Sequence, residues 1–183
     1  MVTSPNLGPT VVRNMTAADI EAVIALDARI TGRRRERYLK PKLEDALVKA
    51  GIRVSLVAEV GGRFVGFLLA KVWYGEFGEL EPVAVLDTLG AHPDFRGKGI
   101  GTSLLDQLRM NLSALGIRCL RTEVAWSDPL LLTFFHHEGF VPAARLVLEA
   151  DPDSPAARAR RERRVAEQEE AAGSESSGGR PRG

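Results

Sequence analysis

The sequence is poor in the features that mark secreted or membrane proteins. It has one cysteine, Cys119, among 183 residues, which excludes an internal disulfide and fits a reducing compartment. No apolar run is long enough to span a bilayer. Residues 1–10 have neither a basic stretch nor an apolar core, so we expect no signal peptide. These absences predict a cytoplasmic protein with no membrane partner.

An excess of charge of either sign is also missing. The 25 Lys and Arg residues nearly balance the 24 Asp and Glu residues, which gives a formal net charge of +1. Such a chain offers no electrostatic reason to bind nucleic acid. The three histidines and the single cysteine do not have the spacing of zinc ligands, so we expect no metal.

Three regions differ in composition. Residues 1–9 hold two prolines and a glycine and are expected to form a flexible leader. Residues 10–150 carry alternating strand and helix patterns, which are typical of one globular domain. Residues 151–183 are charged and lack an apolar face, which predicts a solvated helix or disorder. The alternative for this tail is a docking or oligomerisation arm, and a homodimer is possible.

The apolar patterns of the domain predict the element order β-α-α-β-β-β-α-β-α-β. In the first half we expect strand Val11–Arg13, helix Ala17–Ala28, a helical stretch 33–50 that breaks or restarts at Pro41, and hairpin strands Val54–Val60 and Phe64–Trp73 around Gly61-Gly62. In the second half we expect a strand from Val83, a helix from Ile100, strand Arg118–Ala125, helix Pro129–Glu138 and a last strand or pair of strands in Phe140–Glu149. This order indicates an α/β fold, with a mixed sheet flanked by helices and a parallel crossover from Val83 to Val124.

The most informative stretch joins the strand at Val83 to the helix at Ile100. It reads Arg96-Gly97-Lys98-Gly99-Ile100-Gly101. A helix N-terminus presents unpaired N–H groups and the positive end of the dipole, and glycines let an anion approach the backbone. Three glycines alone would also suit a tight turn, but the flanking strand and helix and the two cations favour a phosphate site. The spacing fits neither a Walker loop (G-x-x-x-x-G-K-S/T) nor a Rossmann fingerprint (G-x-G-x-x-G).

Arg96-x-x-Gly99-x-Gly101 resembles the acetyl-CoA motif Q/R-x-x-G-x-G/A of the GNAT acetyltransferase superfamily. In element order the resemblance spans Val11–Glu149. It implies a GNAT-like sheet of about six to seven strands, splayed between the fourth and fifth strands, with the co-substrate acetyl-CoA in the opening. It also implies cofactor contacts from the strand end and the loop, at Leu89, Gly90, Ala91, Arg96, Gly97, Lys98, Gly99, Ile100, Gly101 and Thr102.

A second GNAT pattern is matched by Glu123-Val124 and by Gly139-Phe140, with two departures between them. Asp128 stands where the family often has asparagine, and Phe135 stands where it often has tyrosine, so the resemblance places both beside the cofactor. In many members the tyrosine hydroxyl is proposed to protonate the leaving thiolate, and Phe135 has no proton to give. Either the thiolate leaves unassisted, or another donor serves, or the protein binds acetyl-CoA and is a poor catalyst.

Two carboxylates are candidates for the base that takes a proton from the amine. Glu123 corresponds to a glutamate proposed as the base in ribosomal-protein N-terminal acetyltransferases. Asp87 precedes the end of the cofactor strand. Structural roles compete, because Glu123 could pair with Arg121 and Asp87 could be a hydrogen-bonded carboxylate at the centre of the sheet. A water relay is a third possibility.

The resemblance implies an N-acetyltransferase that moves an acetyl group from acetyl-CoA to a primary amine. Glu76, Glu79 and Glu81 suit a cationic acceptor, and a protein or peptide lysine or N-terminus is favoured over a small-molecule amine. Arginines such as Arg34 and Arg35 suit a carboxylate-bearing substrate or form a solvated helix face. A non-catalytic acyl-CoA-binding sensor is the alternative from another class, and Phe135 and Asp128 motivate it.

Overall fold

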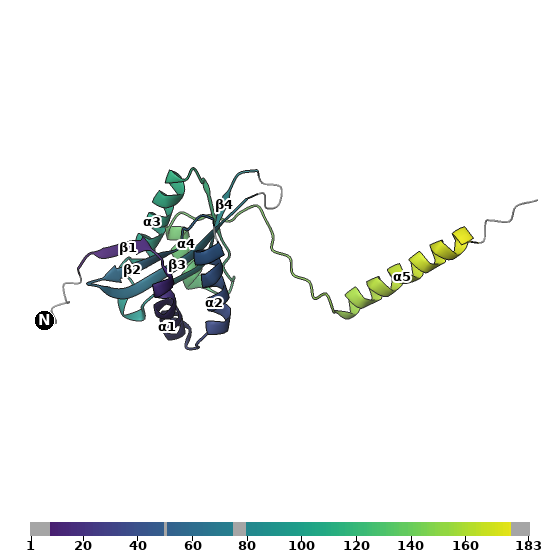
Figure 1. The fold of residues 1–183 in the computed structure, drawn as a ribbon, viewed down its shortest axis with the longest axis horizontal. Helices are drawn as coiled ribbons and strands as arrows, with labels where there is room; N and C mark the ends of the chain where they lie inside the picture. The colour runs from purple at the N-terminus through teal and green to yellow at the C-terminus, as the bar shows by residue number, and fades with distance from the viewer. Residues whose placement is uncertain (1–7, 50, 75–79, 177–183) are drawn as a thin grey trace, which may run out of the picture. The chain divides into compact units, whose positions relative to one another are not determined.

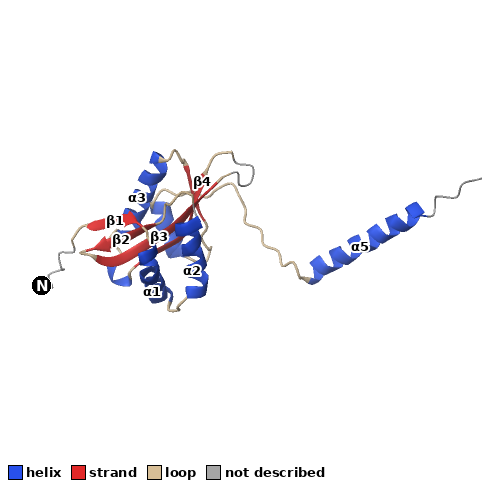
Figure 2. Cartoon of the chain, in the orientation of Figure 1, coloured by secondary structure: helices blue, strands red, loops and turns tan. Residues whose placement is uncertain are grey.

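A computed structural model describes residues 8–49, 51–74 and 80–176 of the chain, which forms two units, one up to residue 140 and one from residue 141. The first unit holds a five-stranded sheet and four α-helices (Figures 1 and 2). Its elements are β1 (Thr10–Asn14), α1 (Ile20–Thr31), α2 (Glu36–Glu44), β2 (Leu56–Val60), β3 (Arg63–Trp73), β4 (Val83–Ala91), α3 (Ile100–Ala114), β5 (Cys119–Thr122) and α4 (Pro129–His137).

The sheet has the strand order β1-β2-β3-β4-β5. Strands β1 to β4 pair antiparallel, and β4 pairs with β5 in parallel. The sequence predicts the antiparallel pairing of β2, β3 and β4 and the parallel crossover to β5. The β2–β3 hairpin turns at Gly61 and Gly62, whose φ angles of 58° and 75° lie in the left-handed region that glycine tolerates. The mixed sheet and its crossover are therefore confirmed.

Alternate residues of the central strands face two separate apolar cores. Leu68 and Ala70 of β3 join the core formed with α3, whereas Phe67 and Leu69 join the core formed with α1 and α2. Because side chains alternate across a strand, a strand that is apolar at every position is buried on both faces. The helices α1 and α2 thus cover one face of the sheet, and α3 covers the other (Figure 2).

Gly66 of β3 brings the start of α3 onto the sheet. A Cβ atom at this position would lie 2.6 Å from Cγ2 of Ile100 and 3.2 Å from Cδ1 of Leu104, which is closer than packed carbon atoms approach. Ile100 is the first residue of α3 and is 2% exposed. The N-terminus of α3 is therefore held against β3 by a contact that only glycine permits.

The second helical stretch differs from its prediction at Pro41, which does not break it. Helix α2 continues through Pro41 to Glu44, and a π-helical turn follows over Asp45–Lys49. Pro41 removes one hydrogen bond to a carbonyl in the first turn of α2, and Pro41 itself is exposed, so water can satisfy that carbonyl.

The prediction of a last strand or pair of strands in Phe140–Glu149 is wrong. Residues 141–150 contain no strand, so the described chain has five strands instead of six or seven. Their apolar residues read as a strand, but a strand also needs a pairing partner, and Val141, Leu146 and Leu148 are 79%, 88% and 86% exposed. Farther along, the second unit forms one helix, α5 (Pro155–Ser176). None of the described helices combines the length and apolar character that a membrane span requires.

An ion pair with a buried carboxylate ties β1 to the start of α1. The guanidinium of Arg13 donates to both carboxylate oxygens of Asp19 at 2.7 and 2.8 Å, and the backbone N–H of Thr16 donates to the same carboxylate at 2.8 Å. The Asp19 side chain is only 8% exposed. Hydrogen bonding from Arg13 lowers the pKa of Asp19 to about 2, and burial opposes part of this shift.

We predict that Asp19→Asn lowers the free energy of unfolding by about 2 kcal/mol at pH 7, because a pKa lowered by roughly two units corresponds to that stabilisation. The native carboxylate has the lower pKa, so its contribution is present above about pH 4 and is lost as the pH falls toward 2. Denaturant unfolding of both proteins from pH 7 to pH 2 measures this, and the curves should converge at the acid end. Asp106→Asn, at a carboxylate that is 58% exposed, should change stability by less than about 0.5 kcal/mol. A constant difference between wild type and Asp19→Asn across this range would contradict the assignment.

Candidate active site

The pairing between β4 and β5 ends in the middle of β4. Its last register pair is Leu86 with Thr122, and the Thr122 hydroxyl donates to the Leu86 carbonyl at 3.0 Å. Strand β4 continues to Ala91, where it still pairs with Gly66 of β3. Residues 87–91 therefore have no strand partner on the β5 side. Backbone N–H and C=O groups on such an edge can bond to an extended ligand.

A tightly bonded turn leads from β4 to α3. The N–H of His92 donates to the Val65 carbonyl at 2.8 Å, and Nδ1 of His92 accepts from the N–H of Asp94 at 3.2 Å. Phe95 is buried, and the N–H of Lys98 donates back to its carbonyl at 3.2 Å. These bonds fix the direction in which the chain enters the helix.

The glycine loop then leaves a row of unpaired donors at the start of α3. Gly97 and Gly99 have φ angles of 70° and 75°, and open space lies over both Cα atoms. The first α3 donor to bond within the helix is Ser103, whose N–H bonds to the Gly99 carbonyl at 2.9 Å. Within the part of the chain that the structure describes, no acceptor forms a hydrogen bond with the N–H groups of Gly97, Gly99, Ile100, Gly101 and Thr102. Together with the helix dipole, such a row of donors fits a diphosphate.

Cations from three parts of the chain surround this turn. Nζ of Lys98 lies 4.9 Å from the centroid of the Phe95 ring, and the guanidinium carbon of Arg63 lies 5.6 Å from it. Arg29 of α1 and Arg63 of β3 each place a guanidinium nitrogen 3.8 Å from Asp94. The sequence pointed to Arg96 and Lys98, which are exposed here, but the role of Arg63 depends on a contact between distant segments.

The other residues expected at the cofactor also pack within the protein. A Cβ atom on Gly90 would lie 2.5 Å from Cε1 of Phe67, whereas Leu89 and Ala91 contact the α3-side core. A Cβ atom on Gly101 would lie 3.0 Å from the ring of Phe134, so this glycine also allows α4 to pack on α3.

Thr102 has a free N–H group but an engaged hydroxyl. Its Oγ1 donates to Glu138 at 2.6 Å, and Arg109 binds the other carboxylate oxygen of Glu138 at 3.1 Å. The Glu138 side chain is 10% exposed. This network joins the first turn of α3 to the end of α4, and the sequence pattern did not reveal it because the residues lie 36 positions apart.

Asp128 and Phe135 both have structural roles. Oδ1 of Asp128 accepts from the N–H of Leu131 at 3.0 Å and so caps α4. Phe135 is 5% exposed, and its ring centroid lies 5.3 Å from that of Phe134 and 4.9 Å from that of Phe140. The Phe135 ring is therefore part of the core.

The two candidate bases follow the last β4–β5 pair directly but have different surroundings. Glu123 is exposed and has no hydrogen-bond or ion-pair partner among the described residues. Asp87, which forms a bulge in β4, accepts from Nζ of Lys42 at 2.7 and 2.9 Å and from the hydroxyl of Thr88 at 2.8 Å. The carboxylate of Asp87 is therefore balanced by a cation, whereas that of Glu123 is not.

Lys42 is held by a phenol as well as by Asp87. Its Nζ lies 2.7 Å from the hydroxyl of Tyr38 and 4.3 Å from the centroid of the Tyr38 ring. Burial lowers the pKa of Lys42, but the bonds to Asp87 and Tyr38 outweigh burial and raise it. The ammonium is thus protonated at neutral pH. The spacing of Tyr38 and Lys42 on one helix turn could have suggested their contact, but nothing local pointed to Asp87.

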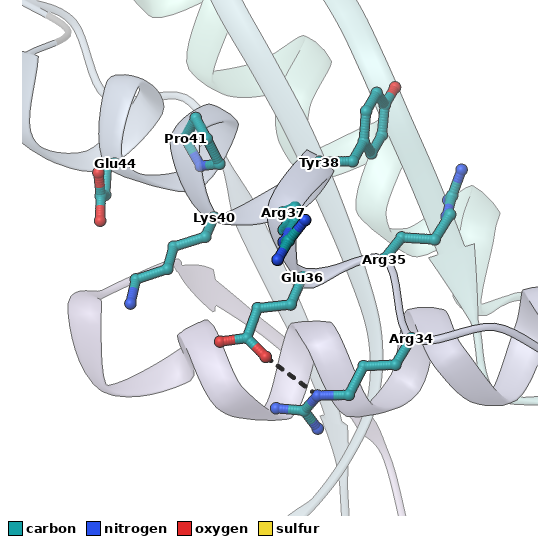
Figure 3. A pocket seen from close by; sticks show the side chains of 8 residues that line it. All are labelled: Arg34, Arg35, Glu36, Arg37, Tyr38, Lys40, Pro41 and Glu44. Atoms are coloured by element: carbon teal, nitrogen blue, oxygen red, sulfur yellow. Dashed lines mark hydrogen bonds and ion pairs between the residues drawn. The ribbon is translucent and has the colours of Figure 1, made fainter.

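A shallow hollow of about 740 Å³ runs along α2, and in Figure 3 Tyr38 and Lys40 leave the helix in opposite directions. Arg34 bonds to Glu36 at 3.1 Å, and Arg35 bonds to the buried Asp27 at 2.5 Å, so acids already balance both arginines. Of the acidic loop expected near the acceptor, Glu76 and Glu79 lie outside the described residues, and Glu81 is exposed. The hollow is lined by Arg34, Arg35, Glu36, Arg37, Tyr38, Lys40, Pro41 and Glu44.

Among the described residues, no three His, Cys, Asp or Glu side chains gather as metal ligands would.

Three solved structures illustrate what the fold is similar to. The aminoglycoside N-acetyltransferase AAC(6')-Iy in complex with CoA aligns with a TM-score of 0.68 and 18% identity, over 81% of this chain and 98% of that one. AAC(6')-Ih from Acinetobacter baumannii gives 0.66 and 17%, over 78% and 98%. The ribosomal-protein-alanine N-acetyltransferase from Brucella melitensis biovar Abortus 2308 gives 0.60 and 20%, over 78% and 99%.

The sequence itself matches a family pattern across the elements that build the site. Residues 20–140, from the start of α1 to the end of the first unit, match the Acetyltransferase (GNAT) family. The matched region contains the glycine loop, the unpaired end of β4 and both candidate bases. The chain therefore belongs to the GNAT family and is an acetyl-CoA-dependent acyltransferase.

Proposed function

We propose that this enzyme acetylates a primary amine on a small cationic molecule. The observation that carries the proposal is the row of unpaired N–H groups at the start of α3 beside the unpaired end of β4. Aminoglycoside acetyltransferases among the similar structures support a small acceptor. A ribosomal-protein-alanine acetyltransferase makes a protein N-terminus the second choice. Nothing supports a preference for protein lysine.

The glycine loop and the end of β4 have distinct tasks in this proposal. The N–H groups of Gly97 and of residues 99–102 bind the diphosphate of CoA, and Arg96 and Lys98 add charge there. The free edge at Leu89, Gly90 and Ala91 binds the extended arm and offers N–H donors to the oxygen on which negative charge develops. Acetyl-CoA supplies the acyl group as a thioester, so the chain itself needs only to position it and to move a proton.

We assign the role of base to Glu123. Its carboxylate is exposed and unpartnered in the described chain, so it can take a proton from the acceptor directly or through water. Both oxygens of Asp87 are engaged by Lys42, which suits Asp87 to binding a cation. The proposal thus separates two carboxylates that the sequence leaves equivalent.

Phe135 gives no proton to the leaving group, and its ring is buried. A thiol pKa near 8.5 makes a free thiolate a tolerable leaving group at neutral pH. We therefore propose that the thiolate leaves unassisted. If this step were too slow, the protein would bind acetyl-CoA without turnover, as a sensor does.

Release of free CoA in the presence of an amine panel tests the activity. The panel contains an aminoglycoside, an aliphatic diamine, a peptide with a free N-terminal alanine and an N-terminally blocked lysine peptide. We expect the aminoglycoside or the diamine to raise CoA release most strongly above the background without acceptor. Binding of CoA by calorimetry with no acceleration by any acceptor would favour the sensor.

We predict that Gly99→Glu weakens CoA binding by about tenfold or more, because its side chain fills the open space over the loop and its carboxylate repels the diphosphate. Loss of a single hydrogen bond to a charged group would already cost roughly 1.5–3 kcal/mol. The matched control is Gly116→Glu at the other end of α3, where φ is 72° and the space is equally open. Both variants carry the same backbone strain, so thermal stability should fall in both, and the helix dipole makes the fall smaller for Gly99→Glu. Calorimetry with CoA should separate them, and equal affinities would refute the phosphate role of the loop.

We predict that Glu123→Gln lowers kcat by about 10²–10⁴-fold, as expected for loss of a general base. The remaining activity should rise toward higher pH, where more of the acceptor amine is already unprotonated. Asp87→Asn should instead raise KM for the acceptor with a smaller effect on kcat. If Glu123→Gln leaves the pH profile unaltered, the proton goes to Asp87 or to water.

A further inference from the structure

The side chain of Lys42 occupies a site built for an ammonium group. Its Nζ contacts both oxygens of Asp87 at 2.7 and 2.9 Å and the hydroxyl of Tyr38 at 2.7 Å, and lies 4.3 Å from the Tyr38 ring centroid. A carboxylate combined with an aromatic face is a general receptor for alkylammonium ions. We call Asp87 and Tyr38 the ammonium cage.

The ammonium cage lies at the edge of the candidate active site. Asp87 is the first residue of β4 beyond the last pair with β5, and it precedes the free edge at residues 89–91. Water reaches all three participants, because Lys42 and Asp87 are 29% and 33% exposed as side chains and Tyr38 is 46% exposed. A small ligand on that edge is therefore close to the ammonium cage.

Lys42 is not needed to hold α2 in place. Leu39 and Leu43 of the same helix are fully buried, and Arg35, which directly precedes the helix, bonds to the buried Asp27. Ion pairs as exposed as Lys42–Asp87 contribute little to stability. The lysine stem is long and flexible, so its ammonium can leave the cage without unfolding the helix.

We propose that the ammonium cage anchors a second ammonium group of the acceptor, which displaces Lys42, so that the preferred substrates are diamines or larger polyamines. This inference rests on the proposed acetyltransferase function. A carboxylate partner keeps an ammonium protonated and therefore not nucleophilic. The caged group thus orients the acceptor, while another of its amines reacts near Glu123. Lys42 serves as a built-in competitor for this site. A monoamine that displaced it would have its only amine held in the cage, with none left to react.

Steady-state kinetics test this with Lys42→Ala. Removing the competitor should lower KM for 1,5-diaminopentane by about fivefold at unchanged kcat, and leave KM for 1-aminopentane within about twofold. Lys40→Ala removes the same charge from the side of α2 opposite Tyr38, and should alter neither KM (Figure 3). Adding Asp87→Asn to Lys42→Ala should abolish the gain. An unchanged or raised KM for the diamine in Lys42→Ala would overturn the proposal.

Fluorine NMR gives a readout that needs no turnover. The chain has two tyrosines, Tyr38 and Tyr74, so a 3-fluorotyrosine-labelled protein should show two signals, which Tyr74→Phe assigns. Titrating labelled Lys42→Ala with tetramethylammonium chloride should move the Tyr38 signal and not that of Tyr74, and sodium chloride should move neither. A Tyr38 signal that ignores tetramethylammonium would overturn the ammonium cage even if acetyl transfer is observed. A responsive Tyr38 signal without transfer to any amine would support the cage and refute the acetyltransferase proposal instead.

Discussion

The candidate site depends on backbone N–H and C=O groups that have no partner within the fold, where β4 leads into α3. Buried backbone donors and acceptors are normally paired within a protein. Here residues 87–91 of β4 extend beyond the last pair with β5. The N–H groups of residues 99–102 have no acceptor among the described residues. The free edge of β4 and the unpaired N–H groups of α3 lie on either side of the glycine loop. One extended ligand with a diphosphate can therefore bond to both.

Such a junction must be held rigidly, because unpaired donors gain affinity only if their positions are fixed before the ligand arrives. Gly66 lets Ile100 dock on β3, and Gly101 lets Phe134 of α4 dock on the same helix turn. The buried Phe95 anchors the turn between β4 and α3. These contacts explain why glycines near the loop serve packing as well as ligand access, two roles that a sequence motif presents as one.

The local features of the fold could be predicted from the sequence, and the long-range ones could not. Gly61-Gly62 specifies the β2–β3 hairpin through its own φ angles, and the glycine loop with its flanking strand and helix forms one continuous stretch, residues 83–114. The pair Lys42–Asp87 joins positions 45 apart, which no local pattern encodes. The prediction of a last strand is wrong for the same reason. Apolar residues 146–148 have strand character, but a strand forms only where a distant segment pairs with it.

The two carboxylates at the end of the β4–β5 pairing show how position decides chemistry. Asp87 and Glu123 each directly follow the last register pair of β4 with β5. From the sequence alone, both are candidates for the base. Helix α2 supplies Asp87 with the ammonium of Lys42, which also bonds to the Tyr38 hydroxyl. No described residue forms a hydrogen bond or ion pair with Glu123. Both oxygens of Asp87 already bond to the Lys42 ammonium, so they are not open to the acceptor amine. The exposed carboxylate of Glu123 is open to an acceptor amine or to a bridging water. One acid thus suits binding of charge and the other suits removal of a proton, and the difference comes from a helix that lies more than 40 residues away from either in the chain.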